Sequence, residues 1–319
     1  MTSRGEFGRI GAMETKARFA LPRVLAWEVT RRCPLRCRHC RAAAEADAPV
    51  ADELSTEECA RILDSIAASG MMIIWTGGEP MLRPDILRLV AHATGLGLRS
   101  VMAPCGMLVT PERMKALKEA GVAACSFSLD GPDAPSHDSF RGVPGAFANV
   151  TAAMRTAREA GMPFQVNTTV STLNLRRLDE IHSLAVSLGA SKLDLFFLVP
   201  VGRGRGIAQY ALSDGETRSV LDWAFEKAAA GPIPIKETCC PSAPSRWAEW
   251  RASHDACGAR PPCGCLGGRG FAFLSHVGEL QTCGFIDKPC GNVRDFGLDF
   301  PSLVAAAANP LGCDGNCRT

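Results

Sequence analysis

No stretch of this sequence is apolar for long enough to cross a membrane, because none reaches the run of about 18 apolar residues that a spanning helix needs. A secretory signal is missing too, since the opening segment MTSRGEFGRIGAMETKARF carries basic residues but no apolar core. An excess of one charge is also lacking: the formal net charge is +2, and no basic run offers a surface for nucleic acid. These absences predict a cytoplasmic protein that binds neither membranes nor nucleic acid.

Cysteine, by contrast, is abundant, with 15 residues in a chain of 319. A cytosolic chain keeps its thiols reduced, so abundant cysteine there favours metal or redox chemistry over disulfides. Hydrophobic residues at 46% and charged residues at 21% are ordinary for a globular protein. The length allows one large domain and a smaller one.

Short apolar runs rich in β-forming residues alternate with stretches of helical spacing. One helix is expected to begin after Ser55, because Glu58 three residues later completes a capping box. Six strand–helix units in series predict an α/β fold, a partial TIM-like (βα)6 barrel, with its active site at the carboxyl ends of the strands. The six expected strands are 24–30, 71–76, 99–103, 123–130, 164–170 and 193–199.

The character of the sequence changes after about residue 231. Alternation stops there, and residues 239–317 hold nine of the 15 cysteines together with many Gly and Pro. Three segments are therefore expected: a flexible leader over 1–22, the barrel over 23–230, and a loop-rich module over 231–319 that depends on bound metal for its order. Met13 is an alternative first residue.

The stretch CPLRCRHC follows the first expected strand and supplies Cys33, Cys37 and Cys40, separated by three residues and then two. Three thiolates fill neither a tetrahedral zinc site nor the four positions of a [4Fe-4S] cube. A cube held by three thiolates keeps one iron open to a small molecule, whereas a zinc site needs a further ligand. The spacing alone leaves both possibilities open.

Beyond its spacing, CPLRCRHC matches the CxxxCxxC signature of the radical S-adenosylmethionine (SAM) superfamily, whose members have a partial βα-barrel. The later stretch TGGEP resembles the GGEP element of the same family. The resemblance implies a [4Fe-4S] cluster on the three cysteines, with SAM on the open iron as the source of a 5′-deoxyadenosyl radical. It also implies that the loop of Gly77, Gly78, Glu79 and Pro80 receives the amino group of SAM.

Other strand ends are implied to hold the ribose and adenine of SAM or the substrate. The fourth strand ends in SFSLDGP, which supplies Ser126, Ser128 and Asp130, and the fifth carries Asn167. His39, just before the last cysteine of the motif, is expected to pack on the adenine end of SAM rather than to ligate iron.

The tail resembles an auxiliary-cluster module, known as SPASM or, in a shortened form, as twitch. Cys265 is followed by twelve residues, Gly278, four more residues and Cys283, as in the opening of that module. The cysteine-dense block that follows in the family is missing, and the sequence ends in GCDGNCRT. The resemblance therefore implies one auxiliary iron–sulfur cluster rather than two. Its expected ligands are Cys239, Cys265, Cys283 and either Cys317 or Cys313.

The remaining cysteines divide into two groups. Those of the tail, which are Cys240, Cys257, Cys263 and Cys290, are alternative ligands of the auxiliary cluster. Those of the barrel, which are Cys59, Cys105 and Cys125, are expected to be ordinary buried residues.

Long stretches, among them SFSLDGPDAPSHDSFRGVPGAF and CLGGRGFAFLSHVGELQTCGFIDKPCGNVR, closely resemble radical SAM enzymes of the alternative, sirohaem-based haem pathway. The resemblance implies oxidative decarboxylation of two propionates of iron-coproporphyrin III to vinyl groups, which gives haem b, or a related tetrapyrrole reaction. A low-potential electron donor such as ferredoxin or flavodoxin is implied as a partner. A substrate rich in carboxylates favours arginine forks. The candidates are Arg141, Arg203, Arg205 and Arg294.

Two other functions remain possible at this stage. Many proteins with such a tail modify peptides, although the two dozen residues before the first strand are too few for the usual peptide-recognition domain. A shortened, non-catalytic paralogue is the second alternative, which the abrupt tail favours and the intact cysteine motif opposes. Reductive cleavage of SAM would separate the second alternative from both enzymes.

Overall fold

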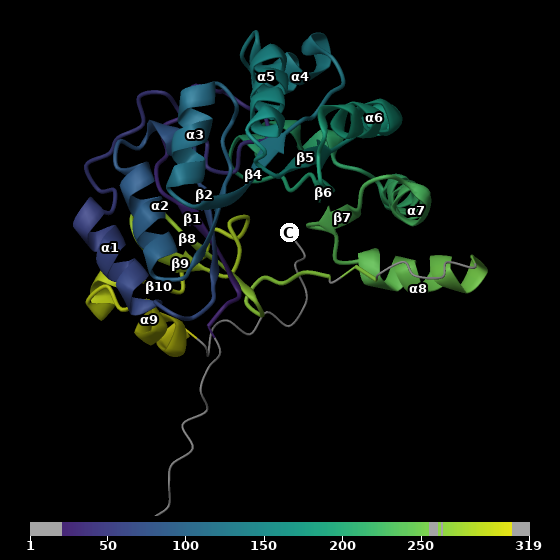
Figure 1. Ribbon diagram of the computed structural model, residues 1–319. Coiled ribbons are helices and arrows are strands. Elements are labelled where there is room, and N and C mark those ends of the chain that lie inside the picture. Colours follow the sequence, from purple (N-terminus) through teal and green to yellow (C-terminus); the bar gives the residue numbers. More distant parts are fainter. Residues whose placement is uncertain (1–20, 255–260, 263, 308–319) are drawn as a thin grey trace, which may run out of the picture.

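The computed structural model describes residues 21–254, 261–262 and 264–307. Within them, one ten-stranded sheet runs in the order β10–β9–β8–β1–β2–β3–β4–β5–β6–β7 and curves into an open arc, with β7 and β10 at its two ends (Figure 1). Neighbours from β8 to β7 are parallel, whereas β9 pairs antiparallel with both β8 and β10. The strands are β1 (Val24–Glu28), β2 (Met72–Thr76), β3 (Arg99–Met102), β4 (Val122–Ser128), β5 (Phe164–Val170), β6 (Leu193–Phe197), β7 (Ile235–Thr238), β8 (Phe271–Leu274), β9 (Glu279–Gln281) and β10 (Gly291–Asn292).

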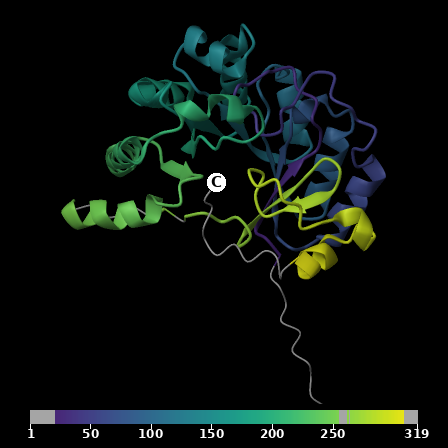
Figure 2. The same cartoon turned by 180° about the vertical axis from the view of Figure 1, so that it is seen from behind.

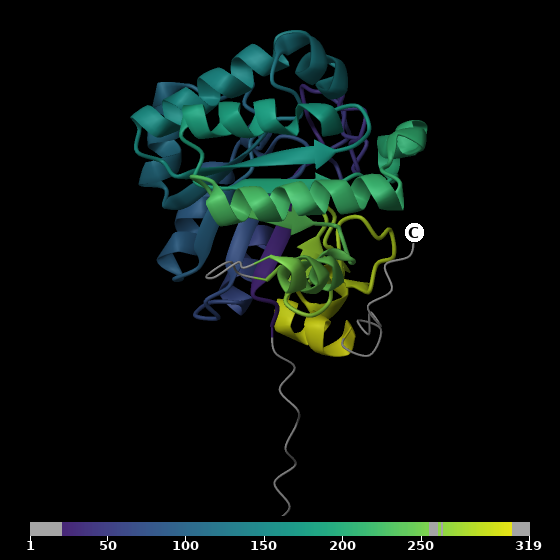
Figure 3. The same cartoon turned by 90° about the vertical axis from the view of Figure 1, so that its right-hand side faces the viewer.

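Helices lie along the outer side of the arc (Figures 1 and 3). They are α1 (Thr56–Ser65), α2 (Ile86–Gly95), α3 (Pro111–Glu119), α4 (Ala134–Arg141), α5 (Ala146–Glu159), α6 (Leu178–Leu188), α7 (Asp214–Ala230), α8 (Ala243–Ser253) and α9 (Phe300–Ala307). Short 3-10 helices are η1 (Pro80–Leu82), η2 (Leu175–Arg177), η3 (Gly202–Tyr210) and η4 (Val293–Phe296). No helix in the described part of the chain combines the length and the apolar character that crossing a membrane requires.

The partial barrel expected from the sequence is confirmed, and its six expected strands are β1 to β6. The tail adds strands that the sequence did not reveal: β7 extends the sheet beside β6, and β8 pairs with the free side of β1 (Figure 2). The sheet therefore runs across the boundary expected near residue 230, and the division of the chain into domains stays a prediction. The expected leader falls almost wholly outside the described residues.

Strand β5 shows how the sheet sorts its side chains. Phe164, Val166 and Val170 are buried toward the helices, whereas Asn167 and Thr169 are half-buried on the other face. Each large apolar side chain buried in this way contributes about 2 kcal/mol to folding. Alternation along parallel strands thus places polar groups on the concave face of the arc.

The capping box expected at the start of α1 is present. The Ser55 hydroxyl accepts a hydrogen bond from the backbone N–H of Glu58 at 3.1 Å, and the Glu58 carboxylate accepts one from the backbone N–H of Ser55 at 2.7 Å. Both donors belong to the unpaired N–H groups at a helix start, so the pair fixes where α1 begins.

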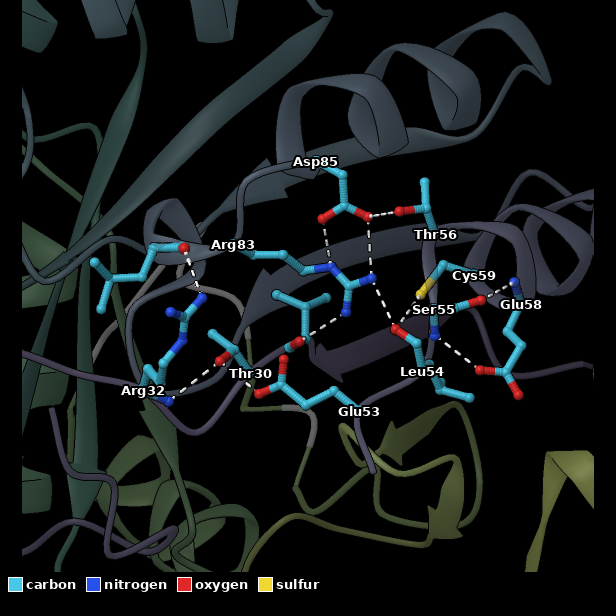
Figure 4. Close-up of polar contacts among 12 residues, drawn as sticks. Thr30, Arg32, Glu53, Leu54, Ser55, Thr56, Glu58, Cys59, Arg83 and Asp85 are labelled. Carbon is cyan, nitrogen blue, oxygen red and sulfur yellow. Dashed lines mark hydrogen bonds and ion pairs between the residues drawn. The ribbon is translucent and has the colours of Figure 1, made fainter. Parts of the chain in front are cut away.

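A buried arginine joins the loops around the first two strands (Figure 4). Arg83 donates hydrogen bonds to the carbonyl oxygens of Val29 at 3.0 Å and Leu54 at 2.8 Å. Its guanidinium also forms a two-pronged ion pair with Asp85, whose carboxylate accepts a hydrogen bond from Thr56. One side chain therefore holds the end of β1, the entry to α1 and the start of α2 together.

We expect Arg83→Met to lower the free energy of unfolding by about 3 kcal/mol, because the change leaves Asp85 and two carbonyl groups without their partner. Urea denaturation of the purified protein measures this loss. Arg88→Met is the matched control on α2, because the ion pair of Arg88 with Glu57 is exposed and such pairs contribute less than about 1 kcal/mol. Equal stability of the two variants would show that the Arg83 contacts do not hold these loops.

Candidate functional site

A pocket of about 250 Å³ opens at the carboxyl ends of the strands, on the concave side of the sheet. It brings together residues from the ends of six strands and from three further places in the chain. Its lining includes Cys33, Cys37, His39, Cys40 and Arg41 from the loop after β1, Gly77 and Gly78 after β2, Cys105 after β3, Ser126 and Ser128 of β4, Asn167 and Thr169 of β5, Phe196 to Val199 at the end of β6, and Arg141, Arg203 and Phe285.

The loop that carries the three cysteines has little secondary structure of its own and is held by its neighbours. The backbone N–H of Arg36 donates a hydrogen bond to the carbonyl oxygen of Arg141 at the end of α4. Arg203, in η3, donates from its side chain to the carbonyl oxygens of Cys37 at 3.0 Å and Ala44 at 2.8 Å. Its backbone N–H donates to the carbonyl oxygen of Cys40. The loop conformation is thus fixed from outside.

The cysteine sulfurs lie in contrasting surroundings. Cys33 and Cys37 are buried, whereas Cys40 is half-buried. A hydrogen bond with Cys105 lowers the pKa of Cys33, while burial raises the pKa of Cys37. The Arg141 guanidinium lies 3.7 Å from the Cys37 sulfur and opposes that rise.

Three cysteine side chains facing one pocket, with a cation beside one sulfur, form a donor set that fits three thiolate ligands of a [4Fe-4S] cluster. No set of three His, Cys, Asp or Glu side chains among the described residues lies close enough to hold a single ion such as zinc.

Cys105 is the residue that the sequence did not single out. From the sequence it is expected to be an ordinary buried residue. In the structure it lines the pocket and packs against the cysteines of the motif. Its position directly after β3 is the same strand-end signal that picked out the other candidates. Cys59 and Cys125, by contrast, are fully buried away from the pocket, and burial raises the pKa of each to about 12.

The two glycines after β2 pack against the cysteine loop. A Cβ atom on Gly77 would lie 2.3 Å from the carbonyl oxygen of Thr30, and one on Gly78 would lie 2.3 Å from that of Arg32. The backbone N–H of Gly78 donates to the carbonyl oxygen of Thr30 at 2.8 Å. Because Gly77 and Gly78 have no side chain, the loop after β2 contacts the backbone of the cysteine loop. The motif had suggested that these glycines allow the close approach of a ligand instead.

Glu79 and Pro80 stand behind this loop rather than in the lining. Glu79 is fully buried, and its carboxylate accepts hydrogen bonds from the backbone N–H groups of Met81 at 2.9 Å and Cys105 at 2.6 Å. Burial raises the pKa of Glu79, although these hydrogen bonds oppose the rise. The carboxylate thus ties the loop after β2 to the loop after β3.

The ends of β4 and β5 form a polar wall. Asn167 donates a hydrogen bond to the hydroxyl of Ser126 at 2.8 Å and accepts one from Gln165 at 2.7 Å. Ser128 lines the pocket nearby, whereas Asp130 is buried beneath it in an ion pair with Arg141. The structure therefore brings three of the four expected side chains to the pocket.

Of the four candidate arginines, Arg141 and Arg203 line the pocket. Arg205 is exposed and lies outside the lining. Arg294 also lies outside it, because its guanidinium pairs with Glu58 at 2.7 Å beside the start of α1. That ion pair joins the tail to the capping box.

His39 stacks on Phe140 with ring centroids 4.4 Å apart and an interplanar angle of 12°. Burial lowers its pKa well below the ordinary value, so the ring is uncharged at neutral pH. The neutral ring lines the pocket beside the cysteine motif. Its packing against the adenine of SAM stays a prediction.

A fully buried carboxylate at the end of β1 gathers three basic side chains. Glu28 contacts Arg31 at 3.1 Å, Arg41 at 2.9 Å and His276 at 3.0 Å. Burial alone would raise the pKa of Glu28, but these three partners lower it to about 2. The carboxylate therefore stays ionised throughout the neutral range.

Arg41 extends this network from the cysteine motif to the tail. Its guanidinium lies over the Phe273 ring of β8 at 4.1 Å and donates a hydrogen bond to the carbonyl oxygen of Gly284 at 3.5 Å. Arg41 follows Cys40, and Gly284 follows Cys283, so one side chain connects the two cysteine-bearing regions.

Two of the expected tail ligands lie close together. A Cβ atom on Gly267 would lie 3.5 Å from the Cys265 sulfur and 3.6 Å from the Cys283 Cβ, so both cysteines border the same glycine. Cys239 follows β7 with a left-handed φ of 60°, and Cys240 is buried. The other candidates Cys257, Cys263, Cys313 and Cys317 lie outside the described residues.

Comparison with known proteins identifies the family of this arrangement. Residues 27–185 match the family described as the Radical SAM superfamily. The AdoMet-dependent heme synthase of Nitratidesulfovibrio vulgaris is 43% identical over 290 residues, which cover 88% of this chain and 78% of that protein.

Two further proteins carry peptide-related names. The PqqA peptide cyclase of Rhodopseudomonas palustris is 31% identical over 296 residues, which cover 91% of this chain and 73% of that protein. The crystal structure of Streptococcus suis SuiB bound to precursor peptide SuiA has a TM-score of 0.67 at 15% identity, and the match covers 94% of this chain and 68% of that chain. At this low identity the likeness to SuiB concerns the fold.

We expect Gly78→Ala to displace the cysteine loop, because the new methyl group would overlap the carbonyl oxygen of Arg32, which belongs to the backbone and cannot turn aside. The free energy of unfolding should fall by about 2 kcal/mol, as for other overpacked sites. The iron content after anaerobic reconstitution should fall as well. Gly95→Ala is the control, because nothing lies within 4 Å of a Cβ there. Full iron content in Gly78→Ala would contradict the role of this contact.

We expect Glu28→Gln to lose stability that depends on pH. The pKa of Glu28 is about 2 in the folded chain against an ordinary 4.5, which corresponds to about 3 kcal/mol of stabilisation when the group is ionised in both states. That stabilisation is fully present above pH 4.5 and is lost as the pH falls toward 2. Urea denaturation at several pH values should therefore show a constant deficit for Glu28→Gln above about pH 5 and a shrinking one below. A deficit independent of pH would refute the charge-based account.

Proposed function

We propose a reaction for this protein from one premise: the chain belongs to the radical SAM superfamily. The protein is a radical SAM enzyme that converts propionate side chains of a tetrapyrrole into vinyl groups by oxidative decarboxylation. Iron-coproporphyrin III is the proposed substrate and haem b the proposed product. The observation that carries this proposal is the three-cysteine pocket in a chain 43% identical, over most of both lengths, to a protein named as a heme synthase.

Cys33, Cys37 and Cys40 each bind one iron of a [4Fe-4S] cluster, and the fourth iron stays available to SAM. When bound, the cluster and SAM supply a 5′-deoxyadenosyl radical, which removes a hydrogen atom from the substrate. The protein's part is to bind the substrate and SAM, to orient them toward each other and to exclude water. Cys33 and Cys37 are buried, which keeps water from their sulfurs. Arg203 holds their loop in place through its hydrogen bond to the carbonyl oxygen of Cys37.

The rest of the pocket divides into a polar and an apolar side. Ser128 and Asn167 line the pocket and offer hydroxyl and amide groups for the ribose of SAM. The backbone of Gly77 and Gly78, which also lines the pocket, is the proposed binding site for its amino group. The flat neutral ring of His39 offers a packing surface for the adenine. At the end of β6 and in the tail, Phe196 to Leu198 and Phe285 form the apolar side, which suits a macrocycle and keeps water out.

The reaction requires an electron acceptor. Loss of one hydrogen atom from the β-carbon of a propionate, departure of the carboxylate as carbon dioxide and removal of one electron leave a vinyl group. We assign the acceptor role to one auxiliary iron–sulfur cluster in residues 231–319, with Cys265 and Cys283 among its ligands. Their shared position beside Gly267 supports this assignment, and Cys239 with Cys313 or Cys317 completes the proposed set. A cytosolic ferredoxin or flavodoxin is the proposed electron donor.

Arg203 is the proposed carboxylate-binding residue of the pocket. It lines the pocket, and its Nε and Nη1 atoms bind the cysteine loop, which fixes the guanidinium in place. A guanidinium held in this way can meet a carboxylate at little cost in side-chain entropy.

A peptide is the second candidate substrate, and the 31% identity to a peptide cyclase over 91% of the chain favours it. The two candidates share the cluster and SAM and differ in what lies against the apolar side of the pocket. A peptide substrate needs partners for its backbone N–H and C=O groups, whereas a macrocycle needs broad apolar contact and cations for its carboxylates.

The test is anaerobic reconstitution followed by reaction with SAM, a reductant and iron-coproporphyrin III, with mass spectrometry of the tetrapyrrole. We expect two successive losses, each matching carbon dioxide and two hydrogens, and one 5′-deoxyadenosine for each loss. The Cys33→Ala variant is the control and should produce neither. Formation of 5′-deoxyadenosine without any change in the tetrapyrrole would overturn the proposed substrate, and a protein that binds no cluster would overturn the whole reaction.

A further inference from the structure

A buried contact beside the cysteine motif joins Arg141, Asp130 and the sulfur of Cys37. Arg141 is the last residue of α4, and its side chain is 10% exposed. Its Nη1 atom lies 3.7 Å from the Cys37 sulfur, and its Nη2 atom pairs with the carboxylate of Asp130, whose side chain is fully buried. The Nε atom is buried and has no hydrogen-bond partner among the described residues.

This geometry leaves Arg141 poorly placed to bind a substrate carboxylate, although its residue type made it a candidate for that role. A guanidinium binds a carboxylate through two parallel N–H groups. Here one terminal nitrogen is directed to Cys37 and the other to Asp130, so both terminal nitrogens are already engaged within the protein.

Asp130 is itself fixed from several sides. Its second carboxylate oxygen accepts a hydrogen bond from the backbone N–H of Thr169 at 2.8 Å, and its carbonyl oxygen accepts one from Asn174 at 3.0 Å. The backbone N–H of Asp130 donates to Nδ1 of His137 at 3.2 Å. The carboxylate therefore sets the direction of the arginine rather than following it.

The backbone at the end of α4 binds the same loop. The carbonyl oxygen of Arg141 accepts a hydrogen bond from the backbone N–H of Arg36 at 3.1 Å. Gly142 has a left-handed φ of 72°, and a Cβ atom there would lie 2.3 Å from the carbonyl oxygen of Arg36. Side chain and backbone together hold the Arg141 guanidinium at a constant distance from Cys37.

We propose that Arg141, held by Asp130, is a positioning residue that sets the reduction potential of the cluster by donating a hydrogen bond to the sulfur of Cys37. This inference rests on the proposed function only in that it needs a cluster on the three cysteines. A hydrogen bond and a positive charge at a ligand sulfur stabilise the reduced, more negative state of a cluster, so they raise its potential. The negative charge of Asp130 lies farther from the sulfur and partly cancels this effect.

Two variants are expected to shift the reduction potential of the cluster in opposite directions. Asp130→Asn removes the opposing negative charge, while the amide oxygen of the new side chain can still accept a hydrogen bond from Nη2 of Arg141 and keep it beside Cys37. The potential of the cluster should therefore rise. The double variant Asp130→Asn with Arg141→Met removes both charges and the hydrogen bond, so the potential should fall below that of the unchanged protein. The double variant also avoids leaving one member of a buried ion pair alone, which is strongly destabilising.

The experiment is a redox titration of the reconstituted full-length protein, followed by electron paramagnetic resonance. The signal that changes when SAM is added identifies the cluster on the three cysteines and separates it from any auxiliary cluster. We expect at least a tenfold change in the ratio of oxidised to reduced cluster at a fixed poise for the double variant, which is about 59 mV for one electron. Arg36→Gln is the control, because it removes an exposed positive charge next to Cys37 in sequence and should leave the potential unchanged.

Shifts of both variants in one direction, or no shift in either, would overturn the proposal, because a merely structural role gives no sign reversal. A changed KM for the tetrapyrrole with an unchanged potential would also overturn it and return Arg141 to the substrate site. Should the double variant yield no folded protein, Asp130→Asn alone decides, and a potential that stays the same or falls contradicts the proposal. Failure of the proposed substrate leaves this measurement intact, because the titration needs the cluster and SAM but no tetrapyrrole.

Discussion

The site depends on one constraint: an irregular loop must present three cysteines to one pocket without secondary structure of its own. Its shape comes from backbone contacts with three neighbours, which are the glycine turn after β2, the end of α4 and η3. The contacts at the glycine turn and at the end of α4 join backbone to backbone, so they leave no freedom for a side chain to adapt. The pairing of β1 with β2 brings the first of them into reach. The register of the parallel sheet therefore controls the position of the cysteines.

Buried charge is concentrated around the same loop, where two carboxylates form ion pairs and Glu79 is held by backbone N–H groups instead. Glu28 pairs with Arg41, and Asp130 pairs with Arg141. Replacing such a pair by apolar groups often costs little stability, whereas removing only one partner is strongly destabilising. Their value here is directional, since a carboxylate fixed by backbone N–H groups or by several cations holds an arginine at one orientation. Arg141 is thus fixed beside Cys37, and Arg41 is fixed next to Cys40 in the chain.

Much of the site could be predicted because strand ends are visible in the sequence. The short apolar runs between stretches of helical spacing located β1 to β6, and residues at or just after the ends of those strands meet at one pocket, as parallel strands require. The same rule fails for long side chains, because it fixes the position of the Cα atom and not the direction of the side chain. Arg141 therefore points to Cys37 and Asp130 rather than to a free ligand, and Arg294 points to Glu58.

Long-range pairing was the other part that the sequence could not supply. Nothing in FAFL or GELQT predicts that β8 lies beside β1, since paired residues such as Val24 and Phe271 are 247 positions apart and any edge strand could pair there. Cys105 was overlooked for a different reason, because a lone cysteine after a strand looks like a small buried residue until its neighbours are known.

The pairing of β8 with β1 also explains why the tail belongs to the site. Because β8 runs parallel to β1, the turn after it and the loop after β1 emerge at the same edge of the sheet. Phe273 of β8 then packs under the Arg41 guanidinium, and the same side chain reaches Gly284. Glu28 holds that arginine through an ion pair and holds His276, two residues beyond β8. Arg41, held by Glu28, therefore links the two cysteine-bearing regions directly.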